Sequence, residues 1–267
     1  MRDQEFVQAT TKFFSRYLIA LCFAFKHRGD GPSAPERFQA ASGFLLSVRG
    51  RILFATAGHI LKNWNQAFDH PEMEIRQSWL CASLKSGLPE TPQLPFDYRH
   101  HKQILWFDRD RGLDYGAIQL SDQQVSQLMA KDVVVVEGEK LPSVNVGFEH
   151  HLILGLPINA TKWDMERATV SPKIMEVMRV PPPFDRIKVE FTEFVGFVGG
   201  EVIEGGPNDM SGMSGGIVFG VSKGGDQLMY SPFAIQSWCR GDEGLAFSCP
   251  IRNFAEHIAA EIDRAKI

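Results

Sequence analysis

The sequence predicts an all-β protein made of two antiparallel β-barrels, and two observations lead to this expectation. Short apolar segments separated by glycines and prolines recur along the chain and fall into two groups. The clearest helical pattern, by contrast, comes only at the end of the chain, at residues 253–266. A fold of alternating strands and helices would need helical segments between its strands, so the pattern favours barrels.

Helices are expected mainly at the two ends of the chain. Residues 1–16 mix phenylalanine and valine with polar neighbours, which predicts a short amphipathic helix. Residues 253–266 place apolar side chains on one side and charged ones on the others. A single helical turn is expected at residues 123–130.

The strands are expected between these helices. The first group comprises residues 17–25, 43–48, 52–57, 104–107 and 115–120. The second group comprises residues 133–136, 144–148, 151–156, 188–194, 216–221, 229–237 and 245–248. The tripeptide Arg49-Gly50-Arg51 predicts a tight hairpin, and turn-forming residues predict loops at 28–36 and 86–98.

Charge and hydropathy exclude two classes of partner. The net charge is −4 and no basic run is present, so a nucleic-acid partner has no electrostatic support. The apolar run at residues 17–25 is too short to span a bilayer. It lies between charged residues and lacks the features of a signal peptide, so we expect a buried strand, no membrane contact and a cytoplasmic protein.

The cysteines and histidines predict no metal site and no cofactor. The four cysteines form no CxxC pair and are too few for a disulfide scaffold, which fits a reducing compartment. Pairing of Cys239 with Cys249, ten residues apart, stays open. The adjacent pairs at 100–101 and 150–151 make poor chelates, because neighbouring side chains of a strand point to opposite faces.

The segment Gly212-Met-Ser-Gly-Gly216 places Ser214 among three glycines. Acyl transfer needs a hydroxyl on a sharply bent backbone with N–H groups aimed at the developing oxyanion, and glycines allow that bend. A simple glycine-rich turn would give the same string. The string also fits the nucleophile elbow of α/β-hydrolases, but that elbow needs a helix after the serine and a histidine downstream. Residues 217–221 instead predict a strand, and the only later histidine, His257, lies on the predicted terminal helix.

Two further segments accompany Ser214. Ala41-Ser-Gly-Phe-Leu-Leu-Ser-Val48 and Phe54-Ala-Thr-Ala-Gly-His59 place a histidine after a strand, and Leu113-Asp114-Tyr-Gly-Ala-Ile-Gln-Leu120 begins a strand with an aspartate. In their order of histidine, aspartate and serine, these segments resemble the motifs of the chymotrypsin/trypsin-like serine protease family, in its disulfide-poor bacterial type. The resemblance covers roughly residues 18–250. The Gly-Leu-Pro157 segment and the Ser237-Trp238 pair are similar to softer family motifs.

The resemblance implies two six-stranded antiparallel barrels. Residues 1–16 would form an N-terminal helical extension, 17–125 the first barrel with His59 and Asp114, 126–250 the second barrel with Ser214, and 251–267 a terminal helix.

The resemblance also implies an endopeptidase that acts on polypeptides through an acyl-enzyme. Ser214 would be the nucleophile, His59 the base and Asp114 the residue that orients His59. Backbone N–H groups of Gly212 and Ser214 would form the oxyanion hole. Asn208, Asp209, Ser237 and Trp238 would bind the substrate, with either Asn208 or Asp209 at the base of the specificity pocket.

The sequence departs from the secreted members of the family. Met213 stands where digestive members carry an aspartate that pairs with a newly cut N-terminus, and the usual disulfides are missing. Activation by such a pairing is therefore not expected. The expected cytoplasmic location leads us to expect an enzyme restrained by a regulatory protein partner, in a bacterial stress or defence setting. The alternative is a catalytically silent scaffold or protein-binding module with the same fold.

Overall fold

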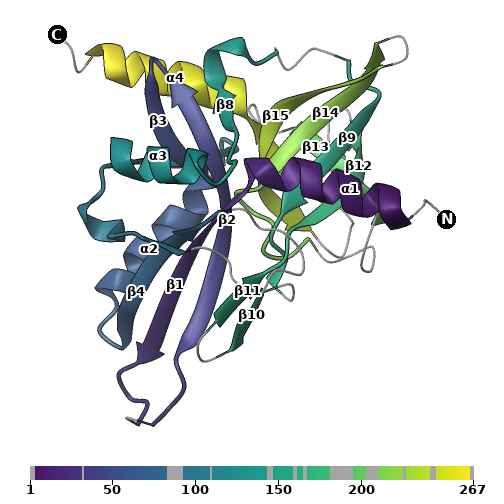
Figure 1. The fold of residues 1–267 in the computed structure, drawn as a ribbon. Helices are drawn as coiled ribbons and strands as arrows, with labels where there is room; N and C mark the ends of the chain where they lie inside the picture. The colour runs from purple at the N-terminus through teal and green to yellow at the C-terminus, as the bar shows by residue number, and fades with distance from the viewer. Residues whose placement is uncertain are drawn as a thin grey trace.

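The structure is a computed structural model that describes residues 4–31, 33–82, 93–108, 110–142, 147–158, 161–164, 167–180, 195–202, 210–224, 227–240 and 245–264. Its strands form two units, with a short hairpin beside them (Figure 1). Several expectations fall outside these ranges: the strand at 188–194, most of the strand at 144–148, and the pocket residues Asn208 and Asp209.

The first unit is an eight-stranded sheet. Its strands run in the order β5-β4-β1-β2-β3-β7-β6, and β8 pairs in parallel with β2. Their bounds are β1 Ile19–His27, β2 Arg37–Val48, β3 Arg51–Thr56, β4 Met73–Cys81, β5 Gln93–Pro95, β6 Gln103–Asp108, β7 Leu113–Gln119 and β8 Val135–Glu137. The expected six strands thus become eight, and β8 lies beyond the expected boundary at residue 125. The proposed division of the chain into domains stays a prediction.

Strand β2 lies between β1 and β3 and pairs with each of them over a different part of its length. Its residues up to Gly43 pair with β1, and those from Phe44 onward pair with β3. A Cβ at Gly43 would collide with the ring of Phe54 and the carbonyl of Ala55. The glycine therefore lets β2 pass from one partner to the other while Phe54 packs directly over its backbone.

The second unit is a closed six-stranded barrel with the order β12-β13-β16-β15-β14-β9. Its strands are β9 His150–Gly155, β12 Lys173–Val180, β13 Val195–Val202, β14 Ile217–Gly224, β15 Gln227–Arg240 and β16 Leu245–Pro250. A separate hairpin joins β10 Thr161–Asp164 and β11 Arg167–Val170. Strands β4, β5 and β10 to β13 were not predicted from the sequence, and Gly147 and Phe148 lie outside any strand.

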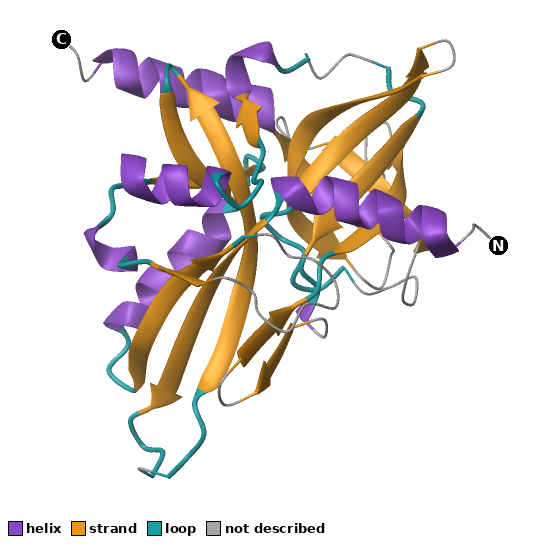
Figure 2. Ribbon diagram, viewed as in Figure 1, coloured by secondary structure: helices purple, strands orange, loops and turns teal. Residues whose placement is uncertain are grey.

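Helices flank the two units (Figure 2). The α-helices are α1 Gln4–Phe14, α2 Gly58–Asp69, α3 Asp122–Met129 and α4 Ile251–Arg264. Short 3₁₀ helices span η1 Ser15–Tyr17, η2 Tyr98–His100 and η3 Gly138–Lys140. The terminal helices and the helix near 123–130 agree with the sequence pattern, and α3 begins with a capping box between Ser121 and Gln124. Helix α2 was not predicted: the sequence placed His59 only after a strand, and the chain forms a helix there.

One apolar cluster joins the two units. It contains Phe44 and Leu46 of the first sheet together with Leu154, Phe219 and Ile235 of the second barrel. Two further clusters fill the interiors of the first unit and of the second barrel. The two units, which are the two halves of the molecule, are therefore packed against each other through buried side chains. This packing fixes the positions of residues in one half relative to those in the other.

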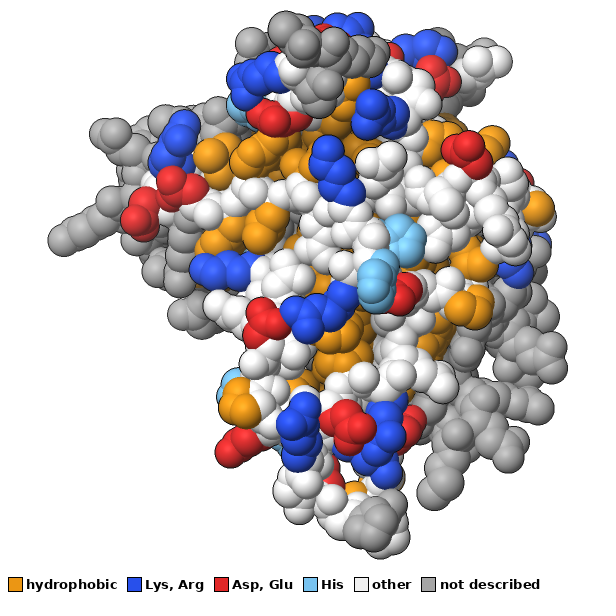
Figure 3. Space-filling model, turned by 90° about the vertical axis from the view of Figure 1, so that its left-hand side faces the viewer, with side chains coloured by type: hydrophobic (Ala, Val, Ile, Leu, Met, Phe, Trp, Pro, Cys, Tyr) orange, Lys and Arg blue, Asp and Glu red, His pale blue; other side chains and the backbone are white. Residues whose placement is uncertain are grey.

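On the face drawn in Figure 3, side chains of both charge signs are interspersed with apolar ones. None of the four cysteines takes part in a disulfide, so no bridge joins Cys239 to Cys249, and the Cys22 thiol donates a hydrogen bond of 3.7 Å to Cys81. Among the described helices, none has the length and apolar character needed to cross a membrane.

His151 of β9 is a buried titratable group that predicts a pH dependence of stability. It is 4% exposed and contacts the rings of Phe148 and Phe233. Burial, then the positive charges of Arg179 and His150, lower its pKa from 6.5 to about 4. The unfolded chain therefore binds this proton more tightly than the folded chain between these values. Stability from this group is present above pH 6.5 and is lost as the pH falls toward 4.

We therefore expect acidification from pH 7 to pH 5 to lower the free energy of unfolding by about 2 kcal/mol through His151 alone. His151→Phe removes the titrating group and keeps an aromatic ring beside Phe148 and Phe233. Urea unfolding of both proteins at the two pH values measures the difference, in which contributions from other groups cancel. Equal losses in the parent and the variant would show that His151 does not titrate in this range.

Candidate active site

The centre of the site is the carboxylate of Asp114, near the start of β7. Asp114 is 3% exposed. Its Oδ1 accepts the backbone N–H of His59 at 2.7 Å, and its Oδ2 lies 2.7 Å from Nδ1 of the same residue. Because a carboxylate only accepts hydrogen bonds, Nδ1 carries a proton in this contact, and Nε2 is the ring nitrogen on the side away from Asp114.

The same contact explains why α2 begins at this point. The first N–H groups of a helix have no partner within the helix, and the N-cap residue Ala57 has no side chain that could accept one. Asp114, on strand β7, supplies the missing acceptor for the N–H of His59. Its negative charge also lies at the helix N-terminus, where the helix dipole favours it. Gly58 permits the approach, since a Cβ there would come within 2.8 Å of the Tyr115 carbonyl oxygen.

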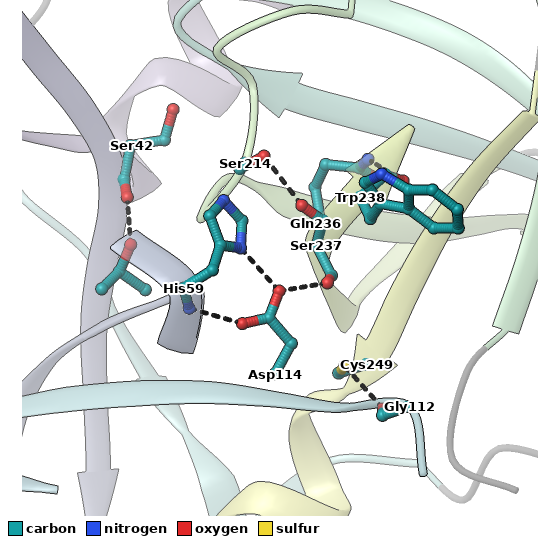
Figure 4. Close-up of polar contacts among 10 residues, drawn as sticks. Ser42, His59, Gly112, Asp114, Ser214, Gln236, Ser237, Trp238 and Cys249 are labelled. Atoms are coloured by element: carbon teal, nitrogen blue, oxygen red, sulfur yellow. Dashed lines mark hydrogen bonds and ion pairs between the residues drawn. The ribbon is translucent and has the colours of Figure 1, made fainter. Parts of the chain in front are cut away.

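The second barrel reaches the same carboxylate through Ser237 of β15. The Ser237 hydroxyl donates a hydrogen bond to Asp114 Oδ2. Its backbone carbonyl accepts the hydroxyl of Ser214 at 2.7 Å. Figure 4 shows the imidazole of His59 between Asp114 and Ser214. In this arrangement the Ser214 hydroxyl is directed to Ser237 and not to His59.

The loop that carries Ser214 is sharply bent. Gly212 and Gly215 have φ angles of 89° and 84°, in the left-handed region that favours glycine. The N–H of Gly216 bonds the carbonyl of Met213 at 3.0 Å, and the N–H of Gly215 bonds the carbonyl of Gln236 at 2.7 Å. These bonds connect the loop to itself and to β15, and they hold Ser214 at the turn.

Gly215 also brings the loop against the first sheet. A Cβ on this residue would collide with the carbonyl oxygen of Ser42 and the hydroxyl of Thr56. Thr56 donates a hydrogen bond of 2.7 Å to that carbonyl, and the Ser42 hydroxyl accepts the N–H of Leu156 at 2.9 Å. Ser42 and Thr56 are fully buried. They connect the two units next to the serine loop, and neither was predicted from the sequence. In the sequence, the feature that could have indicated them is that each is a polar residue within a buried apolar segment.

Two further contacts join the halves near Asp114. The Tyr115 hydroxyl donates to the carbonyl of Pro250 at 3.1 Å, and the Cys249 thiol donates to the carbonyl of Gly112 at 3.5 Å. Both place the beginning of β7 against the end of β16. The position of Asp114 relative to the second barrel is therefore set by several bonds and not by its own side chain alone.

The wall beside Ser237 combines aromatic packing with a buried polar pair. Trp238 stacks on Phe247 with ring centroids 5.3 Å apart. Behind it, Gln236 accepts a hydrogen bond of 2.9 Å from Ser248 and donates one of 3.2 Å to the carbonyl of Trp238. Buried polar groups satisfied in this way keep the wall in one conformation.

The structure brings together most of the residues that the sequence singled out. His59, Asp114, Ser214 and Ser237 form one connected set of polar contacts. Trp238 follows Ser237 directly, and Gly212 lies two residues before Ser214. The direct bond of Ser237 to Asp114 was not predicted, because Ser237 was assigned to substrate binding. Within the described ranges, no group of three or more histidine, cysteine or acidic side chains could hold a metal ion.

Comparison with known proteins identifies the fold of the chain. No family model and no curated protein matches the chain. Among solved structures, the chain is similar to the protease Anisep from Arthrobacter nicotinovorans, with a TM-score of 0.50 and 13% identity over 92% of this chain and 96% of that one. It is also similar to the thermostable serine protease AL20 from an extremophilic microorganism, with a TM-score of 0.50 and 14% identity over 90% and 93% of the two chains. The chain therefore has the chymotrypsin-like fold that the sequence predicted.

Proposed function

We propose that this protein is a serine endopeptidase with Ser214 as nucleophile, His59 as base and Asp114 as the orienting acid. The observation that carries the proposal is the double contact of Asp114 with His59, through the backbone N–H and through Nδ1, each at 2.7 Å. A histidine held in this way has a fixed ring and a fixed tautomer, as general base catalysis requires. The fold of solved serine proteases supports the same function.

The chemistry starts with a rotation of Ser214. Its hydroxyl leaves the carbonyl of Ser237, to which it donates at 2.7 Å, and turns toward Nε2 of His59. The oxygen then attacks the scissile carbonyl while His59 takes the proton, and His59 returns that proton to the leaving amine. Asp114 stabilises the imidazolium between these steps. Water then hydrolyses the ester on Ser214 by the same sequence of proton transfers.

The oxyanion would be held by the backbone N–H groups of Gly212 and Ser214. The positive φ of Gly212, 89°, supports this role, because a peptide in that conformation presents its N–H away from the normal strand direction. Losing one such donor typically raises the barrier by about 2.7–4 kcal/mol.

The substrate chain would lie along Ser237 and Trp238, because the carbonyl of Ser237 is next to the Ser214 hydroxyl. We assign Asn208 or Asp209 to the base of the specificity pocket, from their place before the serine loop in the sequence. Asp209 would favour a basic residue before the cut, and Asn208 would not.

The rival function is that of a catalytically silent scaffold or protein-binding module. The bond from the Ser214 hydroxyl to Ser237 favours it, since this hydroxyl is not bonded to His59. Latency in a cytoplasmic enzyme that awaits a regulatory partner, in a bacterial stress or defence setting, would agree with the same observation. Four cysteines without a disulfide among them agree with a reducing location.

Labelling with a fluorophosphonate separates the enzyme from the silent module. We expect the parent to be labelled and Ser214→Ala to stay unlabelled, because only a serine activated by a base attacks the phosphorus. Ser211→Ala is the matched control. This exposed serine lies three residues before Ser214, and its loss should leave labelling intact. A parent that stays unlabelled while it binds polypeptides would support the silent module.

Asp114→Asn tests the orienting role. An asparagine keeps the size of the side chain but presents an N–H₂ group to His59, which stabilises the wrong tautomer. We expect the labelling rate at neutral pH to fall by about 10³–10⁴-fold, with the fold retained by circular dichroism. Asp110→Asn, an exposed aspartate in the turn before β7, is the control and should label like the parent. A fall of less than about tenfold in Asp114→Asn would remove Asp114 from the triad.

A further inference from the structure

The sheet of the first unit ends at β6, and among the described residues no strand lies beside the outer edge of β6. On its inner side, β6 pairs with β7 along its whole length, with Leu105 opposite Gly116. An edge strand presents a row of backbone N–H and C=O groups on which a further strand can be added. The outer edge of β6 is therefore a candidate interaction surface.

Alternate residues of β6 direct their backbone groups away from β7. The N–H of Gln119 bonds the carbonyl of Lys102 at 2.9 Å, so these two residues form a hydrogen-bonded pair of the antiparallel ladder. Bonded and non-bonded pairs alternate along such a ladder. By this alternation Gln103, Leu105 and Phe107 belong to the non-bonded pairs. Their N–H and C=O groups therefore lie on the outer edge.

Helices cover the two faces of β6, and the edge between them stays exposed. On one face, Trp106 contacts Phe254 of α4, with ring centroids 5.7 Å apart. On the other face, Asn65 of α2 donates a hydrogen bond of 3.0 Å to the side chain of Gln103. Leu105, which lies between these two contacts in the strand, is 38% exposed. The accessible part of β6 is therefore its edge around Leu105.

The opposite end of the sheet has features that protect an edge, and β6 lacks them. The last strand there, β5, spans only Gln93–Pro95 and ends in a proline. The adjacent part of β4 carries the charged pair Glu74 and Arg76, and a β-bulge interrupts its pairing with β1. Short strands, prolines, bulges and charges each oppose the addition of another strand. Residues 104–107 of β6 instead form an uncharged apolar run without proline.

The charges at the two ends of β6 favour a second copy of the same chain as the added strand. Lys102 immediately precedes the strand, and Asp108 ends it. In an antiparallel pair of two copies with a two-fold axis at Leu105, Lys102 of each copy lies opposite Asp108 of the other. The same register places Gln103 opposite Phe107, so that the outward backbone groups of the two strands meet. The strand is therefore complementary to itself in charge and in hydrogen bonding.

Both charges are available for this contact. Lys102 is exposed and forms no ion pair with any described residue. Asp108 uses Oδ1 to accept the N–H groups of Asp110 and Arg111, at 3.1 and 3.2 Å. Its Oδ2 is left to accept from an ammonium group. Such pairs at the rim of an interface contribute mainly to the register and the choice of partner, and an unrelated strand would have to carry both charges at the same spacing.

We propose that β6 is a dimerisation edge, to which β6 of a second copy is added in antiparallel orientation about a two-fold axis at Leu105. The two sheets then form one continuous sheet. Main-chain hydrogen bonds at Gln103, Leu105 and Phe107 hold the copies together, and two pairs of Lys102 with Asp108 fix the register. This interface is independent of the proposed peptidase function, because β6 contains none of the residues assigned to catalysis.

Sedimentation velocity of the full chain over a range of concentrations tests the association. We expect the parent to shift from monomer to dimer as its concentration rises. Leu105→Lys should weaken the dimer at least about tenfold, because two ammonium groups would face each other across the axis. Leu228→Lys is the matched control at an exposed leucine of β15, and its dissociation constant should stay within about twofold of that of the parent.

Three results of this experiment would each overturn part of the proposal. A parent that is monomeric at every concentration would exclude the second copy and leave the edge to a strand of another protein. An unchanged dimer in Leu105→Lys would show that the copies meet elsewhere. Equal weakening by Leu105→Lys and Leu228→Lys would indicate association through exposed apolar side chains in general. Ser214→Ala should dimerise like the parent, which keeps the interface separate from the peptidase function.

A charge reversal tests the register. Lys102→Glu places a carboxylate opposite Asp108 of the second copy and should weaken the dimer at least about threefold at low salt, with a smaller effect at high salt. Lys223→Glu makes the same change of charge at an exposed lysine of β14 and should have no more than about a twofold effect. Equal effects of the two variants would contradict the predicted register and show only the influence of net charge.

Amide hydrogen exchange followed by NMR tests the strand pairing directly. In the dimer, the N–H of Leu105 should exchange at least about tenfold more slowly than at concentrations where the chain is monomeric. The N–H groups of Ile104 and Trp106, which the ladder directs toward β7, should be protected in both states and serve as the internal control. A dimer in which Leu105 exchanges as it does in the monomer would exclude pairing through β6.

Discussion

The arrangement of the site depends on one buried carboxylate. Asp114 accepts hydrogen bonds from the backbone and the imidazole of His59 and from the hydroxyl of Ser237. It thereby joins the start of α2, the start of β7 and the strand β15. A buried carboxylate is tolerated only when such donors replace its water shell, and the N-terminus of α2 contributes a favourable dipole as well. The carboxylate therefore sets the start of the helix and the orientation of the imidazole by the same contacts.

The site also requires a close fit between the two halves, because His59 belongs to the first half and Ser214 to the second. Gly215 packs on Ser42 and Thr56 without room for a Cβ, and Ser42 bonds the N–H of Leu156. Ser237 then connects both sides of the site, with its hydroxyl on Asp114 and its carbonyl on Ser214. Small residues and buried hydroxyls at this contact keep the halves in one register, since a longer side chain would separate them.

Local patterns in the sequence were sufficient to predict many of the helices and strands. The strands around Leu45, Phe54, Ile118 and Phe219 were predicted because apolar runs bounded by glycine, proline and polar turns are typical of buried strands. Helix α4 was predicted because its apolar residues recur at helical spacing. The order of His59, Asp114 and Ser214, each in a recognisable strand or glycine-rich context, led to the fold that the solved structures share.

By itself, then, the sequence determined the class of fold, the terminal helices and the residue types that a triad needs, because these depend on neighbours along the chain. Only the tertiary structure decided that His59 begins a helix, since the acceptor for that helix start is 55 residues away in the sequence. It also decided that Ser237 bonds Asp114, 123 residues away, and that Ser42 and Thr56 support the serine loop. Such contacts cannot be predicted from the periodicity of apolar residues along the chain, because they arise only when distant strands are packed against each other.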